Sequence, residues 1–135
     1  MKIPRIDQTR ARGYVPAFAG ERKKAEADTG YQPVTFYLRP MTEAECDLYD
    51  EFKSRFDPAT GTVSIEPNPE VDARVFADHV ERIANLCFED GETIGSAQAF
   101  LNARQALPRA YNALYQEVLT AIRDYSTLNE GERKN

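Results

Sequence analysis

The feature that most constrains the fold is an apolar stripe within residues 108–127. Its members recur every three or four positions, the period of a helix with one buried face. They are Tyr111, Leu114, Tyr115, Val118, Ile122 and Tyr125. Pro108 stands where proline is favoured, in the first turn of a helix. An apolar face of this width has to pack against a core. The sequence therefore predicts a folded domain organised around this last helix.

The rest of the chain alternates between helical and strand-like patterns. Capping residues and proline breaks followed by apolar residues at helical spacing predict four helices in all. We expect them over residues 42–56, 70–85, 96–107 and 108–127. Two-residue alternation and an Asp-Gly turn predict short strands. We expect these over residues 34–38, 62–66, 86–88 and 92–94. The predicted fold is therefore α+β, mainly helical, with about four helices around one core.

Charge divides the chain into two parts. Residues 1–30 contain seven basic and four acidic residues, a net charge of +3, with scattered glycines and few periodic apolar residues. We expect them to form an extended, flexible N-terminal arm with little structure of its own. Residues 31–135 contain ten basic and eighteen acidic residues, a net charge of −8, and should form a single domain. Because like charges repel, nucleic acid is not an expected partner of this domain.

Neither catalytic nor metal-binding residues stand out in the sequence. The only histidine, His79, lies near Asp72 and Asp78, a set that we interpret as a solvated helix face rather than a site. Cys46 and Cys87 are too far apart for a Cys-x-x-Cys motif and are expected to be buried free thiols. We therefore predict no enzyme, no cofactor and no metal. No stretch approaches the roughly 20 apolar residues of a spanning helix, so no membrane contact is expected and the cytoplasm is the expected location.

A run of residues in the second half of the chain resembles a known family. Residues 80–94, with the Asp90-Gly91 turn near their end, are similar to the centre of the tail assembly chaperones of long-tailed bacteriophages. In that family a helix leads into a short strand, an Asp-Gly or Asn-Gly turn and a second short strand. The short helix, the Leu107-Pro108 joint and a last helix running into residues 125–135 also resemble the family. The resemblance spans residues 33–135 and rests on the order of the elements.

The resemblance implies a non-enzymatic role in the cytoplasm of an infected bacterium. Such a chaperone binds the tape-measure protein in several self-associating copies, keeps it soluble and helps to recruit tail-tube subunits. The expected partner surface is the joint and the outward part of the last helix. Its candidate residues are Arg104, Arg109, Tyr111, Tyr115 and Tyr125. Because tyrosines on one helical stripe are more often core, they bind a partner only if the domain leaves them uncovered.

An alternative follows from residues 1–30, which depart from the compact pattern of the family. A virion structural or connector protein would use such an arm to lace neighbouring subunits together. The two hypotheses differ in whether the protein stays in the finished particle.

Overall fold

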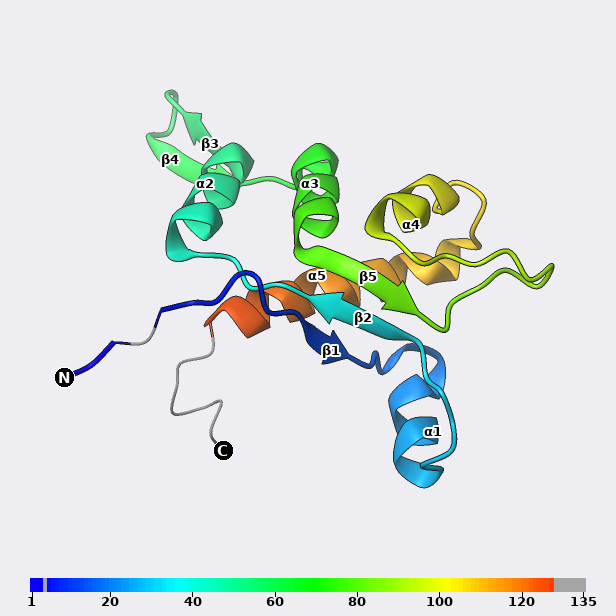
Figure 1. Ribbon diagram of the computed structural model, residues 1–135. Coiled ribbons are helices and arrows are strands. Elements are labelled where there is room, and N and C mark those ends of the chain that lie inside the picture. Colours follow the sequence, from blue (N-terminus) through cyan, green and yellow to red (C-terminus); the bar gives the residue numbers. More distant parts are fainter. Residues whose placement is uncertain (4, 128–135) are drawn as a thin grey trace.

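The computed structural model describes residues 1–3 and 5–127, which adopt an α+β fold (Figure 1). The described residues form five α helices, α1 Glu21–Ala27, α2 Glu43–Lys53, α3 Pro69–His79, α4 Ala97–Ala103 and α5 Asn112–Thr127. Two single turns of 3-10 helix are η1 Phe18–Gly20 and η2 Arg109–Tyr111. The strands are β1 Arg12–Tyr14, β2 Thr35–Leu38, β3 Ser54–Asp57, β4 Thr62–Ile65 and β5 Val80–Ala84. No helix in these ranges is long and apolar enough to cross a membrane.

One antiparallel sheet and three helices enclose the core. The sheet has the order β1-β2-β5, and α5 runs along it on the far side in Figure 1. Helix α3 packs against both α4 and α5. Side chains from β2, β5, α3, α4 and α5 interlock in the centre, where Phe36, Phe76, Phe100, Val118 and Ile122 have no exposed surface. The stripe on the last helix therefore anchors the fold, as its period predicts.

The predicted helix over residues 70–85 is wrong in its second half, because α3 ends at His79 and β5 follows at once. The cause is a β-bulge. Leu38 pairs with Val80 and Tyr37 pairs with Arg82, so Glu81 is an extra residue in the ladder. Val80 and Ile83 consequently both face the core although they are three positions apart. The bulge therefore gives the buried residues of this strand the three-residue spacing that is typical of a helix.

Helix α2 begins as predicted and ends early. Its capping box is present, since Glu45 N donates to Thr42 Oγ1 at 3.1 Å and Thr42 N donates to Glu45 Oε1 at 3.2 Å. The helix stops at Lys53, and β3 and β4 form a separate hairpin beyond it, away from the main sheet (Figure 1). Phe52 and Phe56 would share one face of the predicted helix over residues 42–56, but in the structure both are exposed and only Phe52 belongs to α2.

Residues 12–27, predicted to belong to an arm with little structure of its own, form β1, η1 and α1. Strand β1 pairs antiparallel with β2. Glu117 on α5 accepts hydrogen bonds from the Tyr14 hydroxyl at 2.5 Å, Ala17 N at 2.7 Å and Phe18 N at 3.0 Å. The segment is therefore fastened to the last helix by a partner about a hundred positions away, which no local pattern reveals.

The two predicted strands around Asp90-Gly91 are reduced to a single bridge between Cys87 and Thr93. The turn itself is present, with Phe88 N donating to Glu92 O at 2.8 Å and Gly91 at a φ of 91°. A positive φ of this kind favours glycine, which has no side chain to clash with the backbone.

Candidate functional site

An apolar groove lies between residues 86–94 and the Leu107-Pro108 joint, and we call it the joint groove. Its volume is about 520 Å³. The buried side chains of Ile94, Phe100 and Leu114 belong to the core as well as to its lining. Its other lining includes Leu86, Phe88, Leu107, Pro108 and Tyr111, none of them fully buried. A concave, mainly apolar surface of this kind suits the apolar ridge of another chain.

Backbone geometry creates the two sides of the joint groove. After α4, Leu107 N donates to Ala103 O at 3.1 Å, and the chain then extends at Pro108, with a φ of −55° and a ψ of 146°. This break separates α4 from η2 and α5 instead of continuing one helix. On the opposite side, Ile94 N donates to Leu86 O at 2.9 Å and closes the turn. Both sides are therefore held by hydrogen bonds within the chain.

The candidate arginines lie beside the joint groove, where they line a second hollow of about 250 Å³. Arg104 places its guanidinium 3.7 Å from the centre of the Tyr115 ring and donates to Asn112 Oδ1 at 3.3 Å. Arg109 is exposed on η2. The lining of the joint groove itself includes the carboxylates of Glu89 and Asp90, so its border carries both signs of charge.

The three candidate tyrosines occupy different environments. Tyr111 is half-buried, with its ring centre 5.1 Å from that of Phe18, and it lines both hollows. Tyr125 is half-buried beneath the Arg12 guanidinium, 5.7 Å away. Tyr115 is only 2 % exposed and lies in the core between α3 and α4. Of these three tyrosines, only Tyr111 contributes to the joint groove, and Tyr115 is not at the surface.

The buried position of Tyr115 gives a specific prediction. Its hydroxyl has no hydrogen-bond partner within the described residues, and burial raises its pKa. Tyr115→Phe should therefore leave the free energy of unfolding unchanged or raise it by up to about 1 kcal/mol, because a buried unpaired hydroxyl is removed. Chemical denaturation would measure this. Loss of partner binding by the folded variant would instead show that the hydroxyl is a contact.

The turn within residues 86–94, α4, the Leu107-Pro108 joint and α5 carry part of the resemblance to tail assembly chaperones, and they border the joint groove or lead into it. Residues 80–84, where that family has a helix, form strand β5 instead. No protein-family model, curated protein or solved structure matches the chain. Residues 128–135, which end the resembling segment, lie outside the described residues. The resemblance therefore supports a proposal about function and not membership of a family.

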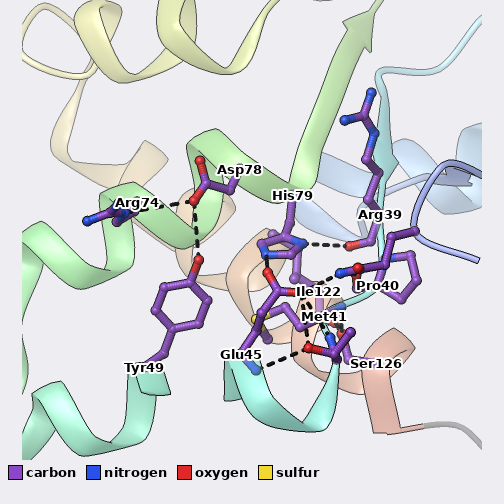
Figure 2. A network of polar contacts seen from close by, with 12 residues as sticks. Arg39, Pro40, Met41, Glu45, Tyr49, Arg74, Asp78, His79, Ile122 and Ser126 are labelled. Atoms are coloured by element: carbon purple, nitrogen blue, oxygen red, sulfur yellow. Dashed lines mark hydrogen bonds and ion pairs between the residues drawn. The ribbon is translucent and has the colours of Figure 1, made fainter. Parts of the chain in front are cut away.

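A polar network at the base of α2 involves the histidine that the sequence analysis placed on a solvated face (Figure 2). That placement is wrong, because His79 is only 3 % exposed. Its Nδ1 lies 3.2 Å from the Arg39 carbonyl oxygen, and its Nε2 lies 3.2 Å from Glu45 Oε2. The second contact lacks hydrogen-bond geometry, so it is electrostatic. Both ring nitrogens therefore face an oxygen atom that can accept a hydrogen bond.

Two other groups of this network have shifted pKa values. Burial acts to raise the pKa of Glu45, but hydrogen bonds from Thr42 and Gln8 and the charge of His79 outweigh it, so the pKa is lowered. Burial and the neighbouring Asp78 carboxylate raise the pKa of Tyr49 to about 12. Tyr49 donates to Asp78 Oδ2 at 3.2 Å. The network joins α2 to the end of α3, and these contacts indicate that it holds the two helices in position relative to each other.

The described residues contain no group of three or more His, Cys, Asp or Glu side chains that could hold a metal ion. Cys46 is half-buried and Cys87 is exposed, so the prediction of a buried thiol is wrong for Cys87. The bridge to Thr93 fixes the backbone of Cys87 beside the joint groove, but its side chain is not enclosed.

Exposed apolar side chains on α2 and the β3–β4 hairpin were not predicted from the sequence. They are Leu48, Phe52, Phe56, Val63 and Ile65, and we call this group the hairpin patch. The exposed fraction reaches 75 % at Ile65. The alternation of residues 62–66 was a usable signal, because it predicts an apolar strand face that needs a cover.

Proposed function

We propose that the protein is a non-enzymatic tail assembly chaperone of a long-tailed bacteriophage, which binds the tape-measure protein and helps to recruit tail-tube subunits. The observation that carries the proposal is the joint groove, an apolar hollow of about 520 Å³ formed by the elements that resemble this family. A tape-measure protein is long and largely helical, so it offers apolar helix faces that have to stay covered before assembly. A groove of this size accepts such a ridge of side chains.

The charges around the joint groove support a partner with both acidic and basic residues beside its apolar face, because Glu89 and Asp90 line the groove and Arg104 and Arg109 lie next to it. Arg104 and Arg109 lie on one side, within reach of carboxylates on a bound helix. Several copies would each cover a short stretch and release it later, so moderate affinity for each copy is sufficient. The site of action that follows is the cytoplasm of the infected bacterium.

A disruption of the joint groove tests the proposal. Leu107→Asp should weaken binding to the tape-measure protein of the same phage by about tenfold or more, because a carboxylate would enter an apolar contact. Binding would be measured by co-purification of the two proteins after co-expression and by titration of a tape-measure segment. The matched control is Gln105→Asp, which adds the same charge at an exposed position outside the groove. Equal binding by a folded Leu107→Asp variant would exclude the groove as the contact.

The alternative function is a virion structural or connector protein. In that function the N-terminal arm would bind neighbouring subunits. Residues 12–14 of the arm are already paired with β2 of their own chain, which argues against their use in such a contact. Mass spectrometry of purified virions separates the two functions. We expect the protein to be missing from virions, and its presence in many copies would favour the connector.

A further inference from the structure

A second groove lies at the edge of the main sheet, between β1 and α5, and we call it the edge groove. Its volume is about 420 Å³. The strand side of its lining consists of residues 12–15 and Leu38. The remaining lining residues are Arg22, Glu117, Thr120, Ala121, Asp124 and Tyr125. None of these residues lines the joint groove, so the two grooves are separate surfaces.

The outer edge of β1 forms one wall of the edge groove. Strand β1 is the last strand of the sheet and pairs only with β2 (Figure 1). A Cβ atom at Gly13 would point toward Thr35 and Tyr37, which lie outside the groove, so Gly13 lines the groove with its backbone. Apart from the ladder with β2, residues 12–14 form no backbone hydrogen bond within the described part of the chain. An unpaired strand edge is the surface to which an extended segment of another chain can add as a strand.

The base of the edge groove is apolar. The buried side chains of Leu38 and Ala121 form this base, and the half-buried rings of Tyr14 and Tyr125 lie around it. Alternate side chains of an extended segment point to the same side, so a segment paired with β1 would direct one apolar side chain into the groove. An unpaired edge beside an apolar pocket is the combination by which extended peptides are recognised.

Four charged side chains line the edge groove, two of each sign, but only two of them are available to a partner. Arg22 Nη2 lies 3.8 Å from Glu117 Oε2, and both side chains are hydrogen-bonded to the Tyr14 hydroxyl. Arg12 and Asp124 are exposed, and neither has an ion pair within the described residues. A matching partner therefore offers an acidic residue to Arg12 and a basic residue to Asp124.

We propose that the edge groove binds an extended segment of a partner protein, which adds to β1 as a further strand. The segment places an apolar side chain over Leu38 and Ala121 and offers an acidic and a basic residue to Arg12 and Asp124. Because β1 is only three residues long, it supplies few backbone hydrogen bonds, and the apolar pocket has to provide much of the affinity. The inference goes beyond the proposed function, since it requires neither the joint groove nor a helical partner.

A peptide library tests this inference on the full-length protein. The probe is a positional-scanning library of heptapeptides with blocked ends, in which each position in turn is one fixed amino acid and the others are mixed. Peptides captured by the wild type should show an apolar preference at one position and acidic and basic preferences at neighbouring positions. Fluorescence anisotropy would then measure the affinity of a single peptide that combines these preferences.

Backbone methylation of that peptide tests its pairing with β1. Methylation of a backbone nitrogen that donates to β1 should weaken binding about threefold to tenfold, the equivalent of one hydrogen bond. Methylation of the next nitrogen along should have little effect, because neighbouring amides of a strand point in opposite directions. Tolerance of methylation at every position would contradict strand addition.

Charge reversal tests the position of the peptide. Arg12→Glu should change the preference for an acidic residue into one for a basic residue, and Asp124→Lys should do the converse, each with the apolar preference retained. Both positions are exposed, and circular dichroism would verify that the variants fold. Lys23→Glu, at an exposed position of α1 outside the groove, is the matched control and should keep the wild-type preferences.

Each other outcome contradicts the proposal in a recognisable way. A wild type that shows no preference in the library excludes an accessible edge groove. Preferences that stay unchanged in both charge-reversal variants would show that the peptide binds elsewhere. The selected peptide should bind Leu107→Asp as it binds the wild type, and a loss there would assign it to the joint groove. Failure of tape-measure binding is a different result, because the edge groove can bind its peptide whether or not the proposed function is correct.

Discussion

Replacing Phe76 by alanine should lower the free energy of unfolding by about 3–5 kcal/mol, the usual cost of emptying a large aromatic site in a core. Phe76 has no exposed surface. Its ring is stacked on that of Phe100 at 5.1 Å and lies 5.3 Å from that of Tyr115 and 6.4 Å from that of Phe36. One ring therefore joins α3 to α4, α5 and β2. Urea denaturation followed by circular dichroism would measure the loss.

The chain offers a matched control for this substitution. Phe52→Ala removes the same atoms from an exposed side chain and should change the free energy of unfolding by no more than about 0.5 kcal/mol. A loss of less than about 1 kcal/mol at Phe76 would contradict the aromatic core described above. A large loss at Phe52 would show that the hairpin patch is covered in the free protein.

Local signals in the sequence were sufficient for much of the fold. The α+β class is confirmed, as is the stripe on α5, and the Thr42–Glu45 capping box is present with both of its hydrogen bonds. These signals act within one or two helical turns, so a single sequence displays them directly. The described residues hold five α helices against about four predicted, because the polar helix α1 has no apolar period to detect.

Contacts between distant residues account for the elements that could not be predicted. The bulge at Glu81 exists only because β5 pairs with β2, and without that ladder the spacing of Val80 and Ile83 indicates a helix. The early end of α2 depends on the pairing of β3 with β4, which removes Phe56 from the helix. Residues 12–27 are held in position by a hydrogen bond to Glu117 and by the pairing of β1 with β2. In each case tertiary contacts override a local preference.

The position of the candidate site was predicted in part, and contacts between distant residues again explain what could not be predicted. The Leu107-Pro108 joint and Tyr111 do lie at an apolar groove, whereas Tyr115, on the same helical stripe, is enclosed by α3 and α4. The spacing of the stripe predicts which side of one helix is apolar. Which of its side chains are buried depends on where the neighbouring helices pack. His79 was misplaced for the same reason, since its partner Glu45 lies 34 positions earlier.

Removing the Glu45 carboxylate should destabilise the protein by about 2–3 kcal/mol at pH 7. Glu45→Ala removes the acceptor for Thr42 and Gln8 and leaves His79 buried without its anionic neighbour. Hydrogen bonds to charged groups are worth about 1.5–3 kcal/mol each, and partial exposure of Glu45 reduces the total. Glu45→Gln should cost less, about 1 kcal/mol, because glutamine preserves the capping box. Glu43→Ala, in the same turn but exposed, is the matched control.

The pH dependence separates the charge of Glu45 from its shape. Because the fold lowers the pKa of this carboxyl below its ordinary value of 4.5, the ionised form is favoured in the folded state. Its contribution is therefore complete above pH 4.5 and is lost as pH falls through the lower folded value. The stabilities of wild type and Glu45→Gln should then converge as pH falls below 4.5 through that lower value, since a protonated carboxyl resembles an amide. A gap that stays constant from pH 7 to pH 3 would show that shape, and not the charge facing His79, makes Glu45 important for the attachment of α2.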